Sequence, residues 1–221
     1  MRAIAPTSDY FQSQYRDYER QNPPRKLDHY LTVIGDHWEG EHADLLDVGC
    51  GLGSFLEQAR LRHPIWELNG TDIDRTGVET TLARVPEAEV VNISADQQSH
   101  PDQCFDIVTA WDVLEHVEAL NDAGDSIAAM LRPGGIFVFV VPVYDGPLGP
   151  VVEYLDKDPT HLHKRGRDWW LDWAAERFDI LDWHGIFRYL VPGGRYIHLS
   201  TQPLRRFSTA ILVVCAPGHR R

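Results

Sequence analysis

The chain has 221 residues, of which 33 are acidic and 21 basic, and its formal net charge is −12. This balance argues against a broad nucleic-acid-binding surface, because such surfaces need clustered lysine and arginine side chains. The 43% of apolar residues fits a chain that buries a sizeable core, and the three distant cysteines form none of the usual zinc or redox spacings.

The amino-terminal 40 residues are expected to form a helical cap. Aromatic residues recur at near-helical spacing within residues 8–19, and Pro23-Pro24 ends that helix and begins a second one that runs to Trp38. Both helices can pack an apolar stripe on the domain, and the first could also cover a ligand cleft and exclude water. Residues 1–6 lack the apolar core of a signal peptide, and isolated cysteines suit a reducing compartment, so a cytoplasmic location is expected.

The middle of the chain alternates predicted strands with predicted helices. Strands are expected at 44–49, 66–72, 88–93, 105–111 and 136–141, and helices at 52–63, 74–85 and 120–131. This alternation predicts an α/β fold with a mostly parallel sheet and helices on both faces. The longest apolar run, residues 136–143, is too short to cross a bilayer and is better explained as a buried strand.

The composition changes after Pro142. Residues 144–159 are rich in Gly, Pro and Asp and are expected to form a long loop at the carboxyl edge of the sheet. A helix is expected at 167–177, a sixth strand at 178–183, an insertion with a Pro-Gly-Gly turn at 187–203, and a final strand at 207–214. We therefore expect one domain over 1–221, with a cap (1–40), a ligand-binding core (44–142) and a substrate-side part (143–221).

The run Asp47-Val48-Gly49-Cys50-Gly51-Leu52-Gly53 carries the first functional signal. It lies between a predicted strand and a predicted helix, where glycine tolerates positive φ and lets the backbone approach a ligand. A dinucleotide site would have a third glycine at position 54, which is serine, and no lysine follows as in a phosphate-binding loop. Glycine turns after strands are also common without any function, so the assignment depends on later motifs.

The second signal is Asp72, at the end of the second predicted strand. A carboxylate about twenty residues beyond the glycine turn can accept hydrogen bonds from both ribose hydroxyls of a nucleoside. Asp74 is better explained as a helix cap. Nicotinamide enzymes use the same device, so Asp72 indicates a nucleoside without choosing the cofactor.

Three further motifs follow in order: Ser94-Ala95-Asp96, the segment FDIVTAWDVLEHV at 105–117, and LRPGG at 131–135. With the glycine run, they resemble the class I S-adenosylmethionine-dependent methyltransferases over about residues 44–142. The resemblance implies a Rossmann-like, doubly wound sheet of seven strands, the last antiparallel, with S-adenosyl-L-methionine across its carboxyl edge. It also implies cofactor-binding positions at Asp47, Gly49, Cys50, Gly51, Asp72, Ile73, Ala95, Asp96 and Trp111.

The same resemblance suggests what these positions contact. The glycine run and Asp47 would border the methionine part of the cofactor, and Asp72 would hold the ribose. Ile73 would lie against the adenine, Asp96 would bind its amino group, and Trp111 would face the methionyl end and the substrate. Methyl transfer needs alignment more than a charge clamp, and alignment alone can supply about 7–11 kcal/mol of a barrier.

Two histidines are candidate catalytic bases. His116 could take a proton from the acceptor, or could orient its own loop through hydrogen bonds. His161 lies in Asp-Pro-Thr-His-Leu-His, which is similar to a D-P-x-H segment of related small-molecule methyltransferases, and an imidazole titrates near neutral pH. His163 is a further option. A metal held jointly by Asp145, Asp158, His161 and His163 matches no known ligand spacing, so no metal is expected.

The sequence therefore predicts methyl transfer to an O, N or C atom of a small molecule, with neither nucleic acid nor membrane as partner. The sequence departs from the small-molecule methyltransferases in two places. It has Arg177-Phe178 where they often have Gly-Phe, and it carries the insertion at 187–203, so the acceptor is left undefined. A homodimer stays open. The alternatives are a catalytically silent cofactor-binding subunit, a nicotinamide-dependent oxidoreductase that shares Asp72, and a protein-methylating enzyme.

Overall fold

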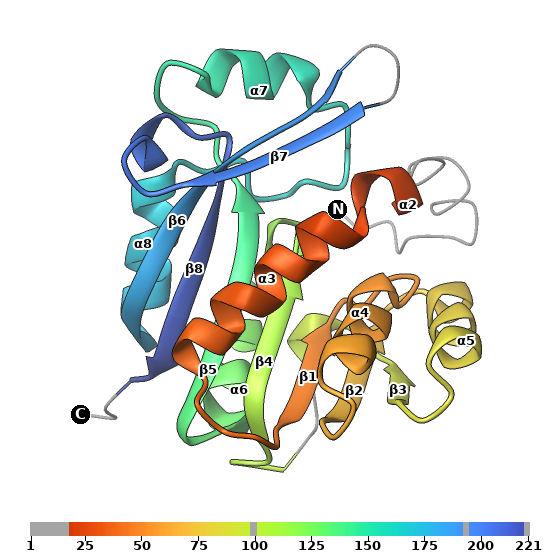
Figure 1. Cartoon of the computed structure of the whole chain (residues 1–221). Helices are drawn as coiled ribbons and strands as arrows, with labels where there is room; N and C mark the ends of the chain where they lie inside the picture. The colour runs from red at the N-terminus through yellow and green to blue at the C-terminus, as the bar shows by residue number, and fades with distance from the viewer. Residues whose placement is uncertain (1–17, 98–100, 192–194, 219–221) are drawn as a thin grey trace.

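The structure is a computed structural model of the chain, and it describes residues 18–97, 101–191 and 195–218 (Figure 1). The described strands are β1 (Asp44–Val48), β2 (Glu67–Asp72), β3 (Glu89–Asn92), β4 (Phe105–Trp111), β5 (Leu131–Pro142), β6 (Phe178–Val191), β7 (Arg195–Thr201) and β8 (Ala210–Pro217). The described helices are α2 (Tyr18–Gln21), α3 (Pro24–His37), α4 (Ser54–Arg62), α5 (Arg75–Arg84), α6 (Leu120–Met130), α7 (Gly149–Leu155) and α8 (Arg167–Ala175). Short 3-10 turns are η1 (Ala95–Gln97), η2 (Leu114–His116) and η3 (Arg205–Phe207).

The described strands form one sheet in the order β3-β2-β1-β4-β5-β8-β6-β7. The first five are parallel to their neighbours, β8 is antiparallel to both β5 and β6, and β7 is antiparallel to β6. The predicted Rossmann-like fold with an antiparallel last strand is confirmed. Because the chain leaves β1 toward β2 on one side and later adds β4 on the other, a crevice opens at the carboxyl ends of β1 and β4.

Side chains that alternate along the strands form two apolar layers, one on each face of the sheet. Phe137 and Phe139 of β5 pack with α6 and α8, whereas Val138 and Val140 pack with α3 and α4. This alternation follows from the two-residue period of a strand. Burial on both faces explains why the central strands are continuous apolar runs without polar alternation.

The predicted insertion adds an eighth strand to the seven that were expected. Residues 185–191 of β6 pair with β7, so the insertion is a β-hairpin that extends the sheet at its edge. The Pro-Gly-Gly turn was recognised in the sequence, but the two runs beside it were not assigned as strands. The turn itself, residues 192–194, lies outside the described residues.

Beyond Pro142, part of the expected loop is helical. The predicted loop 144–159 contains α7, whose first turn holds Pro150, a residue suited to a helix start but also read as a loop signal. The aromatic helix expected at 8–19 lies mostly outside the described residues, and only its last residues appear, in α2. α3 begins at Pro24 as predicted. Within the described chain, no helix has the length and hydropathy needed to span a bilayer.

Candidate functional site

The turn between β1 and α4 holds three glycines in the left-handed region, with φ of 71° at Gly49, 57° at Gly51 and 78° at Gly53. A Cβ atom at Gly49 would lie 2.4 Å from the Val113 side chain, and one at Gly51 would lie 2.6 Å from the Tyr18 hydroxyl. The N–H groups of residues 49 and 50 donate to the Thr71 carbonyl over 2.7 and 2.9 Å. The glycines are therefore required by the backbone, and they form a cradle that a side chain would fill.

Asp72 ends β2 directly beneath this turn. Its Oδ2 accepts the N–H of Gly51 and its Oδ1 accepts the N–H of Asp74, each over 2.8 Å. Burial raises the pKa of Asp72, while these backbone donors lower it in part. Each carboxylate oxygen can accept a further hydrogen bond, so the fixed carboxylate can still hold two ligand hydroxyls. The Asp74 side chain accepts the N–H of Thr76, which confirms the predicted cap of α5.

Asp47 is the last residue but one of β1 and is fully enclosed. Thr109 of β4 donates a hydrogen bond of 2.7 Å to its Oδ1. Burial raises the pKa of Asp47 to about 8, against the opposing effect of Thr109, and the negative charge of Asp72 adds to the rise. The neighbouring thiol of Cys50 is also buried, and burial raises its pKa well above the usual value, so it is unreactive. A cationic ligand beside Asp47 and Asp72 would lower their pKa values and favour the charged form of both carboxyl groups.

The raised pKa of Asp47 predicts that stability falls as pH rises. The folded chain keeps this proton up to about pH 8, whereas the unfolded chain loses it near about pH 4. Between these values the folded state binds more protons, so the group removes up to about 1.4 kcal/mol of unfolding free energy per pH unit. Urea denaturation of the ligand-free protein between pH 5 and 8 should show a flatter profile for Asp47→Asn.

The surface variant Asp102→Asn is the matched control and should follow the wild-type profile, because residue 102 is exposed. If the stability of wild type and of Asp47→Asn changed in parallel across the whole pH range, Asp47 would not carry the proposed proton in the folded state.

Trp111 ends β4 and forms the wall of the crevice. Its ring stacks on Tyr30 of α3, with centroids 4.3 Å apart and planes 17° apart, and meets the edge of Phe55 of α4 at 5.0 Å. Its indole Nε1 is buried and, within the described chain, has no hydrogen-bond partner. The ring is thus held rigidly, with a donor left for a ligand or a bound water.

The remaining predicted cofactor positions lie at the ends of β2 and β3. Ile73 is 48% exposed beside the buried Asp72, which is an unusual position for an apolar side chain unless something covers it. Ala95 is buried in η1, and the Asp96 carboxylate next to it accepts a hydrogen bond from the Ser94 hydroxyl. All nine positions therefore lie at the carboxyl ends of β1 to β4, and their contacts with a cofactor stay predictions.

Tyr18 lies over the glycine turn. Its hydroxyl accepts the N–H of Leu52 over 3.4 Å, and burial raises its pKa. The same segment is attached through Glu19, which pairs with Arg84 of α5, and Arg84 also donates to Ser54 at the start of α4. The described end of the amino-terminal segment thus lies over the cradle, whereas the cover expected from the rest of the aromatic helix stays a prediction.

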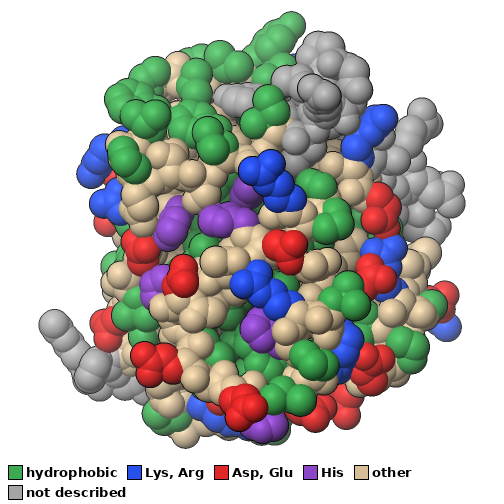
Figure 2. All heavy atoms as spheres, in the orientation of Figure 1, with side chains coloured by type: hydrophobic (Ala, Val, Ile, Leu, Met, Phe, Trp, Pro, Cys, Tyr) green, Lys and Arg blue, Asp and Glu red, His purple; other side chains and the backbone are tan. Residues whose placement is uncertain are grey.

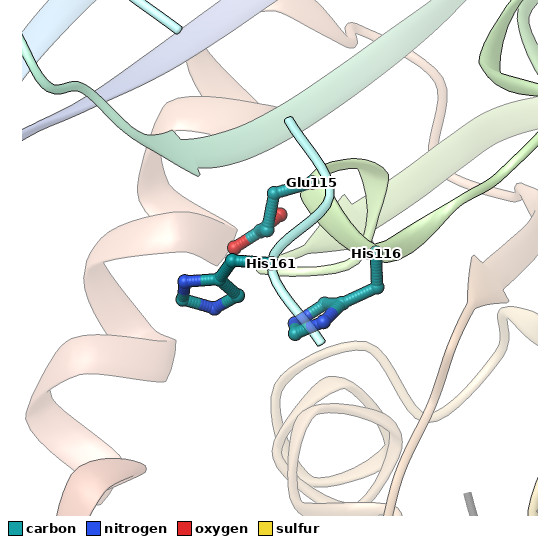
Figure 3. Close-up of side chains that lie close together, drawn as sticks. All are labelled: Glu115, His116 and His161. Atoms are coloured by element: carbon teal, nitrogen blue, oxygen red, sulfur yellow. The ribbon is translucent and has the colours of Figure 1, made fainter. Parts of the chain in front are cut away.

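The two candidate bases, predicted separately, lie side by side. His116 belongs to η2 and His161 to the chain before α8, and their ring centroids are 4.6 Å apart. The N–H groups of Leu162 and His163 donate to the Glu115 carbonyl over 2.8 and 3.0 Å, which ties the two segments together. Glu115 completes the group: one ligand atom from each of the three side chains lies within 4.8 Å of the other two (Figure 3).

Hydrogen bonds fix the orientation of both imidazoles. His116 Nδ1 lies 2.9 Å from the Thr160 hydroxyl, which itself donates to Asp158 over 2.6 Å, so Nδ1 is the donor toward Thr160. His161 Nδ1 lies 2.8 Å from Asp156 Oδ2. In both rings Nε2 is the nitrogen left for another group. Burial lowers the pKa of His116 to about 4, with a further contribution from His161, so this ring is neutral at pH 7.

Glu115 is the residue that sequence reasoning missed, although it stands next to His116 in the quoted motif. Its side chain is 1% exposed, and both carboxylate oxygens lack a hydrogen-bond partner within the described residues. Burial raises its pKa well above the usual value, and the nearby charge of Asp112 adds to this. A buried carboxyl group without a partner is rare and points to a role outside packing.

Asp112 links the end of β4 to two cations. It adopts φ of 58°, which aspartate tolerates better than most residues, and pairs with Arg188 of β6 and with Lys26 of α3 at 3.8 Å. Burial alone would raise the pKa of Asp112, but Arg188 and Lys26 outweigh it and hold the value below normal. Burial lowers the pKa of Lys26 to about 8.

The four residues considered together as metal ligands do not converge. Asp145 is bonded to Arg167 through both carboxylate oxygens, and His163 donates from Nε2 to the Val117 carbonyl over 2.8 Å. His161 joins Glu115 and His116 instead. Two hollows in the described surface, one beside Asp44 and one beside Pro133, lie at the opposite edge of the sheet and contain none of these side chains.

Comparisons with known proteins agree with this geometry. A family model described as a methyltransferase domain matches residues 17–197. The ubiquinone biosynthesis O-methyltransferase of Alkalilimnicola ehrlichii is 31% identical over 121 residues, which are 52% of this chain and 47% of that protein. The mitochondrial arginine-hydroxylase NDUFAF5 of Rattus norvegicus is 29% identical over 128 residues, or 54% and 36% of the two chains.

The match therefore spans about half, or less, of the length of these curated relatives. Among solved structures, a chain of the complex between the Haloferax volcanii Trm112 methyltransferase activator and a methyltransferase superposes with a TM-score of 0.72. It is 15% identical, and the superposition covers 96% of this chain and 95% of that one. This likeness shows the fold.

Proposed function

The chain belongs to the methyltransferase domain family, in the class I S-adenosylmethionine-dependent branch, and on this premise we propose that it methylates a small molecule. The methyl group would pass from S-adenosyl-L-methionine to an oxygen, nitrogen or carbon atom of the acceptor. The observation that carries the proposal is the Asp72 carboxylate, held by two backbone N–H groups beneath the glycine cradle with acceptor capacity to spare. The relative named as an O-methyltransferase favours a hydroxyl acceptor.

The residues present fit this cofactor. A Cβ atom at Gly51 would collide with the Tyr18 hydroxyl, so glycine is what lets Tyr18 pack directly over the turn. Asp72 has lone pairs for ribose hydroxyls, and exposed Ile73 beside it offers an apolar surface for a base. When bound, S-adenosylmethionine supplies a methyl group on a positively charged sulfur, and the Asp47 carboxyl group, neutral in the ligand-free protein, would ionise more readily beside that cation.

The chain's own contribution is alignment and exclusion of water. The indole of Trp111, clamped between Tyr30 and Phe55, gives the crevice a rigid wall. Tyr18 covers the glycine turn from the other side. Rigid walls around the reacting groups supply the alignment on which an in-line displacement depends.

An apolar surface lies beside the acceptor end. Figure 2 shows hydrophobic side chains gathered at the top of the molecule, over the region where Figure 1 places α7 and β7. Its exposed members include Val151, Tyr154, Leu155, Ile197 and Leu199. α7 ends at Leu155, and the next residue, Asp156, bonds to His161. This arrangement supports an acceptor with an apolar part next to its reacting group.

His161 is the group we assign to removal of the acceptor's proton, either as the base itself or as a ligand of an ion that acidifies the acceptor. Asp156 orients its ring and leaves Nε2 available. His161→Gln should lower turnover by about 10²–10⁴-fold and leave cofactor binding unchanged. His163→Gln is the matched control, because the His163 side chain donates to the Val117 carbonyl and glutamine can donate to the same atom. Near-normal turnover of His161→Gln would reject the assignment.

Calorimetric titration tests the function itself. Protein stripped of bound ligand should bind S-adenosylhomocysteine and not NAD, and labelled S-adenosylmethionine should then label a small molecule in a metabolite extract. Binding of NAD instead would support the oxidoreductase alternative. Binding of S-adenosylhomocysteine without a labelled product in either the metabolite extract or a protein lysate would favour a silent regulatory subunit. Label that appears only in the protein lysate would indicate a protein acceptor.

A further inference from the structure

We propose that Glu115, His116 and His161 bind a divalent transition-metal ion at the acceptor end of the site. The three residues lie just beyond Trp111, where η2 meets the chain before α8 (Figure 3). The task of the ion rests on the proposed methyl transfer, but its binding does not and can be measured separately.

The donor atoms are close enough to share one ion. Ligands that are each about 2.1 Å from an ion lie about 3–3.5 Å apart, and one atom of each side chain here lies within 4.8 Å of the other two. Binding one ion would require the side chains to move closer by the remaining distance of about 1–2 Å. The Glu115 carbonyl accepts from Leu162 and His163, so the two segments that carry the ligands are already held in register.

Both histidines have the outer partners typical of metal ligands. A coordinating imidazole usually donates its second N–H to a carboxylate, a carbonyl or a water, which fixes the tautomer and raises its basicity. His161 Nδ1 meets Asp156 directly at 2.8 Å, and His116 Nδ1 reaches Asp158 through the Thr160 hydroxyl. These hydrogen bonds occupy Nδ1 of both rings and leave Nε2 available for an ion.

The buried carboxyl group of Glu115 supplies a second observation. It is 1% exposed, and within the described chain neither of its oxygens has a hydrogen-bond partner. Isolating a carboxylate from water costs several kcal/mol unless a cation or donors compensate. Arg188, whose charge acts on Glu115 from a distance, makes its ion pair with Asp112 instead, and Lys164 pairs with Asp156. An ion on Glu115 would provide the missing positive charge.

The donor set indicates the class of ion. Two imidazole nitrogens and one carboxylate suit Mn²⁺, Fe²⁺, Co²⁺ or Zn²⁺, whereas Ca²⁺ and Mg²⁺ prefer oxygen and Cu⁺ prefers sulfur. Three protein ligands leave open positions for an acceptor hydroxyl. The ion would lower the pKa of that hydroxyl, so its O–H bond breaks and the proton passes to water. His161 would then act as a ligand and not as the base.

The test is metal titration of chelator-stripped protein. Calorimetry with Zn²⁺ and with Mn²⁺, and the visible spectrum of added Co²⁺, should report one equivalent bound by the wild type. Asp156→Asn should weaken binding by about 10–100-fold, and Glu115→Gln and His161→Gln should weaken it more. Glu115→Gln keeps the side-chain shape and removes a buried acid, so it should stay folded, which circular dichroism checks.

His163→Gln and the exposed Glu118→Gln are matched controls and should bind as the wild type does. No binding by the wild type, or equal binding by Glu115→Gln, overturns the site. If S-adenosylhomocysteine still binds in that case, the proposed function is unaffected. Stripped protein that transfers methyl at the full rate overturns the ion's task, whereas turnover restored by Zn²⁺, Mn²⁺ or Co²⁺ supports it.

Discussion

Asp72→Ala is expected to weaken S-adenosylhomocysteine binding by at least about 100-fold. Hydrogen bonds to a charged group contribute about 1.5–3 kcal/mol each. Loss of the two hydrogen bonds to the ribose should therefore raise the dissociation constant by a factor of about 100 or more. The substitution also leaves the N–H groups of Gly51 and Asp74 without their acceptor, which loosens the cradle. Calorimetric titration of the purified variant measures the loss.

Asp74→Ala is the matched control for this change. It removes the cap of α5, which costs about 1 kcal/mol of stability, but leaves the Asp72 carboxylate in place. Its melting temperature should fall while its affinity stays near the wild-type value. If Asp72→Ala retained affinity within tenfold of wild type, the ribose assignment would have to be abandoned.

Asp145→Ala is expected to destabilise the fold by about 3–5 kcal/mol, because it leaves a buried charge without its partner. Arg167, at the start of α8, is 3% exposed and donates from Nε and Nη2 to the Asp145 carboxylate. Its Nη1 and Nη2 also donate to the carbonyls of Arg205 and Ser208. These bonds tie the chain after β5 to α8 and to the start of β8.

Urea denaturation should give this loss as a lower midpoint with an unchanged slope. Asp168→Ala, at the residue after Arg167 in α8, is the control. The Asp168 carboxylate is exposed and 4.0 Å from Arg206, so its loss should cost less than about 1 kcal/mol of stability. Asp145→Ala combined with Arg167→Met should recover part of the stability. Equal costs for the two aspartates would show that the ion pair between Asp145 and the buried Arg167 is not a main support of the fold.

The consequences of Asp145→Ala should extend to the proposed acceptor site. The segment between Asp145 and Arg167 carries α7, Asp156 and His161, and the ion pair closes this segment at its two ends. We therefore expect the variant to lose turnover even at temperatures where it stays folded. Loss of stability with normal turnover would separate the two roles.

The motifs that we propose to bind the cofactor could be recognised in the sequence because they depend on local geometry. A strand, a turn that only glycine can form, and a helix follow one another within residues 44–62, and Asp72 ends the next strand. The period of two in the strands and of 3.6 in the helices shows in the residues themselves. Even so, α7 and the β6–β7 hairpin escaped prediction, because Gly and Pro in short elements resemble loop signals.

The sequence by itself therefore determined the parallel core, the glycine cradle and the acidic carboxyl edge, since each follows from neighbours in the chain. Only the tertiary structure brought His116 to Thr160, 44 residues away, and Arg188 to Asp112, 76 residues away. It also showed that Glu115 is buried without a hydrogen-bond partner among the described residues beside two imidazoles. These contacts depend on the order of the strands and on backbone bonds between distant loops, which no local periodicity encodes.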